Sequence, residues 1–173
     1  MSAQWTVTGS AAVWLSNSGS GPKIKHVTFG KIVDLGVKDA NNMGAAMAPA
    51  AYDSLSRHLQ DTGIDYDMIV TGDLGTIGKG IVNKMFNEDN KSIESKYDDC
   101  GTIIFDVKKQ DVHAGGSGCG CSAAVFGSFF YKKLLNNEIK KLLLASTGAV
   151  HSPTATLQGE SIPGIAHCLG IEM

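Results

Sequence analysis

The chain has 173 residues, 43% of them hydrophobic, a mean hydropathy near zero and a formal net charge of −2. These values are typical of an ordinary globular domain with a full core, and the weak negative charge argues against nucleic acid or acidic lipid as an electrostatic partner. No apolar run approaches the roughly 18 residues of a membrane-spanning helix, and the N-terminus lacks the basic start and apolar core of a signal peptide. We therefore expect any membrane contact to go through a protein partner.

The cysteine pattern indicates reduced thiols. The sequence holds Cys100, Cys119, Cys121 and Cys168, and a domain of this size does not need disulfides to be stable. Cys119 and Cys121 are spaced C-x-C, and no histidine pair follows at ligand spacing. We predict an intracellular protein without a structural metal site.

The first third of the chain predicts two strands followed by a helix. The strands are rich in β-branched residues, the turn between them is made of glycine, serine and proline, and the helix carries Pro49 in its first turn. Its apolar residues Ala51, Leu55 and Leu59 follow i, i+4, i+8 spacing. The predicted ranges are a strand over 6–15 interrupted at Gly9, a turn over 17–22, a strand over 24–34 and a helix from Met47 to about Gln60.

The remainder predicts alternating strands and helices. We expect strands over 66–71, 101–105, 141–147 and within 161–172, with helices over 79–87 and from the glycine-rich turn to about Leu135. From Ile24 the order is β-α-β-α-β-α-β-β, which predicts an α/β fold with a mixed five-stranded sheet. The strand over 6–15 precedes this unit and is interpreted as the end of a structural unit that lies before it in the sequence.

A glycine-rich turn leads directly into the last predicted helix. Four of its residues are Gly115, Gly116, Gly118 and Gly120, and glycine lets another group approach the backbone closely. The helix that follows is apolar almost all round in its first turns, which predicts a buried central helix. Its N-terminus would direct free N–H groups at one place, suited to an anion or an oxyanion. The alternative is a tight strand-to-helix connection without a ligand.

The order of elements resembles one half of the thiolase fold, in which two such halves stack as αβαβα layers. Short blocks, in order along nearly the whole chain, more closely resemble the stage V sporulation protein AD family. These blocks are residues 7–13, 33–36, 43–51, 71–74, 99–101, 114–123, 146–149, 152–154 and 160–167.

The resemblance implies a binding module rather than an enzyme. Members of this family bind dipicolinic acid and act in its uptake, with calcium, into the developing spore of endospore-forming bacteria. A full member is about twice as long, so the chain resembles the C-terminal half, with residues 1–16 ending the preceding half and 17–173 forming the C-terminal domain. The implied partners are the N-terminal half and membrane subunits of the stage V sporulation A complex, and the implied location is peripheral, at the spore inner membrane.

The glycine-rich turn is the first candidate ligand-binding segment. Amides of Gly115, Gly116, Ser117 and Gly118 are expected to bind a ligand carboxylate without any lysine. His113 is expected to add a donor or, in an enzyme, a general acid. The alternative is a loop histidine without a special role, because Ala114 follows where thiolase-like enzymes usually have proline.

The second candidate segment is Asp99-Cys100-Gly101. Asp99 is expected to form a polar pocket wall; it would repel the bare dipicolinate dianion unless a calcium ion lay between them. The alternative is a strand-edge or capping aspartate, and Asp73 allows the same two interpretations. Cys100 is expected to line the pocket or to be an ordinary buried cysteine, because neighbouring carboxylates raise a thiol pKa and disfavour a nucleophile.

No catalytic residue and no cofactor is assigned, apart from calcium carried with dipicolinate. The run Ser146–Ala149 stands where thiolases have their second catalytic cysteine, and it contains none. Two other functions remain open: half of a ketoacyl-synthase-like acyltransferase completed by another chain, and a purely structural partner. Because half of a stacked fold exposes apolar surface, we expect the isolated chain to form a homodimer.

Overall fold

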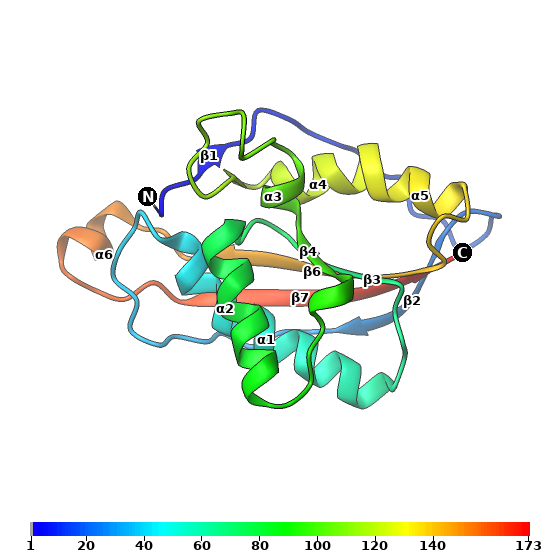
Figure 1. The fold of residues 1–173 in the computed structure, drawn as a ribbon, viewed down its shortest axis with the longest axis horizontal. Helices are drawn as coiled ribbons and strands as arrows, with labels where there is room; N and C mark the ends of the chain where they lie inside the picture. The colour runs from blue at the N-terminus through cyan, green and yellow to red at the C-terminus, as the bar shows by residue number, and fades with distance from the viewer. Residues whose placement is uncertain (1) are drawn as a thin grey trace.

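The computed structural model describes residues 2–173 as a central sheet with helices on both faces (Figure 1). The five strands follow the order β2-β7-β6-β3-β4; β3 is parallel to β4 and β6, and β7 is antiparallel to β6 and β2. The elements are β1 (Trp5–Thr6), β2 (Lys23–Thr28), α1 (Met43–Thr62), β3 (Met68–Thr71), α2 (Gly75–Glu88), the 3-10 turn η1 (Glu94–Lys96), β4 (Tyr97–Asp99), α3 (Cys100–Ile103), β5 (Gly116–Ser117), α4 (Cys121–Val125), the π-helical turn η2 (Phe126–Phe130), α5 (Tyr131–Leu135), β6 (Lys141–Ala149), α6 (Pro153–Leu157) and β7 (Gly164–Glu172).

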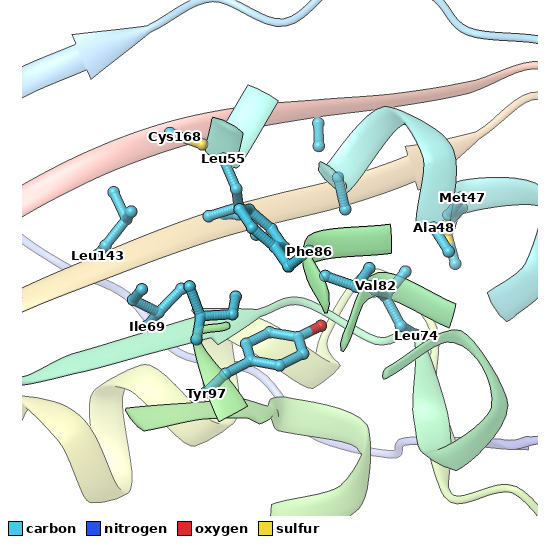
Figure 2. Close-up of a cluster of buried hydrophobic side chains, with 14 of the residues drawn as sticks. Met47, Ala48, Leu55, Ile69, Leu74, Val82, Phe86, Tyr97, Leu143 and Cys168 are labelled. Atoms are coloured by element: carbon cyan, nitrogen blue, oxygen red, sulfur yellow. The ribbon is translucent and has the colours of Figure 1, made fainter. Parts of the chain in front are cut away.

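Two hydrophobic clusters fill the space between the sheet and its helices. Successive residues of a strand point to opposite faces, so Leu143 and Ala145 of β6 join the cluster under α1 and α2, while Leu142 and Leu144 join the cluster under α4 and α5. Figure 2 shows the first cluster, in which Leu55 and Phe86 from the two helices meet strand residues. The predicted mixed α/β sheet and its β-α-β-α-β-α-β-β order are confirmed.

Helix α1 starts and ends where its local chemistry requires. The Asn42 side chain accepts a hydrogen bond from the Ala45 amide (3.4 Å), and Gly63 closes the other end in the left-handed conformation with φ +63°. Pro49 was predicted in the first turn but lies inside the helix, in its second turn, where it removes one backbone hydrogen bond. The helix is therefore longer than the predicted 47–60, and α2 likewise begins at Gly75 rather than at residue 79.

Three predicted strands need correction. The strand predicted over 101–105 is wrong: the strand is β4 (97–99), and Asp99 then caps the helix α3 over the next four residues. The strand predicted over 6–15 is reduced to Trp5–Thr6, which pairs with β5 in a separate two-stranded sheet. The strand predicted over 24–34 ends at Thr28, although Val33 still forms an isolated bridge to Gly164.

The central helix is buried on one side only. Val125, Phe130 and Leu134 contact the sheet, whereas the exposed fractions of Phe129 and Leu135 are 41% and 45%. The prediction of a helix buried all round is therefore wrong for this chain. The outer side of α4 and η2 is covered only in part, by the extended segment after β1, in which Gly9 lies against Ala124 and Ala11 against Gly127 (Figure 1). Among residues 2–173, no helix is both long enough and apolar enough to span a membrane. The assignment of residues 1–16 to a preceding half stays a prediction.

Candidate functional site

Three loops meet at one edge of the sheet. Strands β3, β4 and β6 are parallel, so their carboxyl ends lie at the same edge, where α/β proteins usually bind ligands. The loop after β3 carries Asp73, and β4 ends at Asp99. The glycine-rich turn over 115–118 approaches both, since Gly118 bonds to Asp73 and Gly116 lies against Gly101.

Asp99 is the buried centre of this edge. Its side chain has no exposed surface, and one oxygen accepts hydrogen bonds from the Thr71 hydroxyl (2.7 Å) and the Leu74 amide (2.9 Å). The other oxygen accepts from the amides of Gly75 (2.8 Å) and Gly101 (3.0 Å). Burial raises the pKa of Asp99 to about 6, although these donors lower it.

The position of Asp99 is that of a capping residue. Its carboxylate caps α3 and reaches no surface of this chain, so the alternative of a strand-edge or capping aspartate describes what the structure contains. A ligand role for Asp99 stays a prediction.

Asp73 connects the loop after β3 to the glycine-rich turn. Its carboxylate accepts hydrogen bonds from the Gly118 amide (2.9 Å), the Ser117 hydroxyl (3.4 Å) and the Thr147 hydroxyl (2.7 Å). Burial raises the pKa of the Asp73 carboxyl, against the opposing effect of these donors. The chain's own carboxylate thus occupies the place at the turn that the sequence suggested for a ligand anion.

The amides of the glycine-rich turn are largely used within the chain. The Gly115 amide donates to the Val112 carbonyl (2.9 Å), the Gly118 amide to Asp73, and the Cys121 amide to the Gly118 carbonyl (2.9 Å). The amides of Gly115 and Gly118, two of the four that were expected to bind a ligand carboxylate, therefore already have acceptors within the chain, and a ligand role for the turn stays a prediction. The glycines instead permit close packing, since a methyl group on Gly101 would overlap the Gly116 carbonyl oxygen.

A cavity of about 120 Å³ opens beside the turn, at the N-terminus of α1. Its polar side chains are Gln4, Asn41 and Ser117. Ala3, Ala40 and Met43 complete the wall. Of the eight residues expected to bind ligand, only Ser117 lines this cavity. Sequence reasoning missed Gln4 and Asn41, which lie far from the motif in sequence.

The remaining predicted residues lie outside the cavity wall. Cys100 is fully buried, and burial followed by the charge of Asp99 raises the pKa of its thiol strongly, which agrees with the expected direction and makes it a poor nucleophile. His113 is exposed, adopts a positive φ of 51° and lies 3.2 Å from an Asp111 oxygen. Among residues 2–173, no group of three His, Cys, Asp or Glu side chains is placed to hold a metal ion.

These features of the sheet, helices and cavity define a class of protein. A five-stranded mixed sheet of this order, with helices on both faces and a polar cavity at the strand ends, is consistent with one half of a thiolase-like α/β structure. The sequence model of the family "Stage V sporulation protein AD (SpoVAD)" matches residues 1–172. Stage V sporulation protein AD of Bacillus subtilis (strain 168) is 46% identical over 165 residues, which cover 94% of this chain and 48% of that protein. The chain belongs to the stage V sporulation protein AD family, and it spans about half the length of this relative.

Proposed function

We propose that the chain is the C-terminal half of a dipicolinate-binding sporulation protein, which takes part in uptake of dipicolinate, with or without calcium, into the developing spore. The observation that carries the proposal is the family match over almost the whole chain. The cavity at Gln4, Asn41 and Ser117 supports it, because a small polar hollow at the strand ends suits a ligand of few atoms.

The state of the thiols favours binding over acyl transfer. Cys100 and Cys121 have no exposed surface, and burial raises the pKa of Cys121 to about 12. A thiol that remains protonated at neutral pH is a weak nucleophile. Cys119 is exposed, but an acyltransferase also needs a base in contact with its nucleophile. We therefore propose a non-catalytic role.

The outer side of the central helix is proposed as the surface that meets the N-terminal half. Phe129, Tyr131 and Leu135 of this helix are 41%, 37% and 45% exposed, and large apolar side chains left exposed together are typical of an interaction site. Without that half, two copies are expected to cover the same surfaces as a homodimer, which light scattering at micromolar concentration would detect. Membrane subunits of the stage V sporulation A complex are the proposed partners that hold the protein at the spore inner membrane.

Calorimetry with dipicolinate, with and without calcium, tests the function on the chain combined with its N-terminal half. We expect saturable heat from the wild-type protein. The affinity for dipicolinate should fall about tenfold in Asn41→Ala and in Ser117→Ala, because each variant loses one hydrogen bond. Asn17→Ala and Ser20→Ala, in an exposed turn away from the cavity, are the matched controls. Absence of heat from the properly assembled wild-type protein would contradict the proposal.

A further inference from the structure

Thr147 forms a two-way contact with Asp73 across the edge of the sheet. The Thr147 hydroxyl donates to a carboxylate oxygen of Asp73 (2.7 Å) and accepts from the Asp73 amide (3.1 Å). The loop lies tightly against this hydroxyl, because a Cβ atom on Gly72 would be 2.5 Å from Thr147 Oγ1. One side chain therefore fixes both the backbone and the side chain of Asp73.

Asp73 in turn holds two of the three polar residues that line the cavity. Ser117 donates to its carboxylate (3.4 Å), and Gln4 Nε2 donates to its backbone carbonyl (2.9 Å). The same Gln4 nitrogen also donates to the Gly116 carbonyl (2.8 Å), so the N-terminal segment is tied to both loops. The contacts form a continuous chain from Thr147 through Asp73 to the cavity wall.

Thr147, at one end of this series of contacts, belongs to the firmly held strand β6. Strand β6 is paired with β3 on one side and with β7 on the other, and Thr147 lies opposite Ala166 within the β6–β7 pairing. The glycine-rich turn has no such support of its own, because β5 is only two residues long and pairs with the two residues of β1. Precise binding sites need their contacting residues held by a supporting layer of this kind.

We propose that Thr147 and Asp73 are positioning residues, which hold Ser117 and Gln4 in place at the cavity without touching the ligand. This inference rests on the proposed function only where ligand affinity is concerned; the position of the turn is a property of the chain itself. Removal of the Thr147 hydroxyl leaves the Asp73 carboxylate with fewer hydrogen-bond donors in buried surroundings. The loop that carries Asp73 then lacks the hydrogen bonds that hold it against β6.

The test compares Thr147→Val, which keeps the side-chain shape without the hydroxyl, with Thr147→Ser, which keeps the hydroxyl. Both are made in the chain combined with its N-terminal half. Amide hydrogen exchange at Ser117 and Gly118 reports the turn, and exchange at Leu143 reports the core as an internal reference. Thr62→Val is the control, because its hydroxyl bonds to the His58 carbonyl (2.8 Å) at the far end of α1, about 28 Å along the helix from Met43.

We expect the amide exchange rate of Gly118 to rise about tenfold in Thr147→Val and to equal the wild-type rate in Thr147→Ser and in Thr62→Val. The exchange rate of Leu143 should be the same in all of these proteins. Dipicolinate affinity should fall by a similar factor in Thr147→Val alone. Unchanged exchange at the turn, or equal acceleration at Leu143, would overturn the positioning role. If wild-type protein binds no dipicolinate, the proposed function fails while the exchange result still decides this inference. Should Thr147→Val not fold, Asp73→Asn tests the same contact, with faster exchange at Gly118 expected.

Discussion

Replacement of Asp99 by alanine should destabilise the fold severely. At pH about 7.5 this carboxylate, with a pKa of about 6, is ionised, and it accepts the amides of Leu74, Gly75 and Gly101 inside the protein. Each buried amide left without an acceptor costs roughly 1–3 kcal/mol. If water reaches one of the three, the two amides that remain lower the free energy of unfolding by about 2–6 kcal/mol, a large part of the stability of an ordinary domain.

Urea unfolding followed by circular dichroism measures this loss, with Asp98→Ala as the control. Asp98 stands next in sequence, but its side chain is 34% exposed and bonds to Lys79 and Thr102, which water can replace. A loss of under about 1 kcal/mol in Asp99→Ala would refute the reasoning. The result also decides how binding data are interpreted, because lost dipicolinate heat in Asp99→Ala would reflect a damaged fold and would not place the pocket.

Three further predictions follow from buried or closely packed groups. Burial lowers the pKa of His58, whose ring contacts Thr28 and Tyr66, so the folded state binds fewer protons than the unfolded state. The urea midpoint should therefore fall as the pH drops below about 6.5, and it should fall less steeply in His58→Gln. Equal dependence of the midpoint on pH in the two proteins would contradict this. Gly101→Ala should cost at least about 2 kcal/mol because its methyl meets the Gly116 carbonyl, while Gly80→Ala, in open space within α2, should be neutral or stabilising by up to about 1 kcal/mol in the same assay. Cys119 is exposed and the other three cysteines are buried, so a thiol reagent should modify one equivalent in native protein; rapid reaction of a second would show that the core near Cys100 or Cys121 opens.

The layered fold was predictable because long apolar runs carry their own pattern. The run over Leu142–Leu144 and the amphipathic spacing of α1 are local signals, and they predicted the order of strands and helices along the chain, although not the order of the strands within the sheet. Strand β4 was missed because its residues are Tyr97, Asp98 and Asp99, and carboxylates are rare in strands. They are tolerated there because neighbouring loops supply donors, which no local pattern reveals.

The connections within the candidate site were not predictable from the sequence. The glycine-rich turn and the loop that carries Asp73 were separate candidate segments, and the structure brings them together through the hydrogen bond from the Gly118 amide to Asp73. Asp73 and Thr147, however, are 74 positions apart in sequence, and Gln4 is 69 positions from Asp73. Such contacts are set by the topology of the sheet, and no local pattern around Thr147 predicts them.

The two edges of the sheet restrict how this protein can associate. Edge strand β2 carries Lys23 and Lys25 and has a register shift between Ile24 and His26, and the opposite edge, β4, is three residues long. Lysines, irregular pairing and shortness are the features by which natural sheets prevent another strand from joining them. These features disfavour growth of the sheet by strand addition and so act against fibril formation through its edges. We expect a partner to meet the helical faces instead.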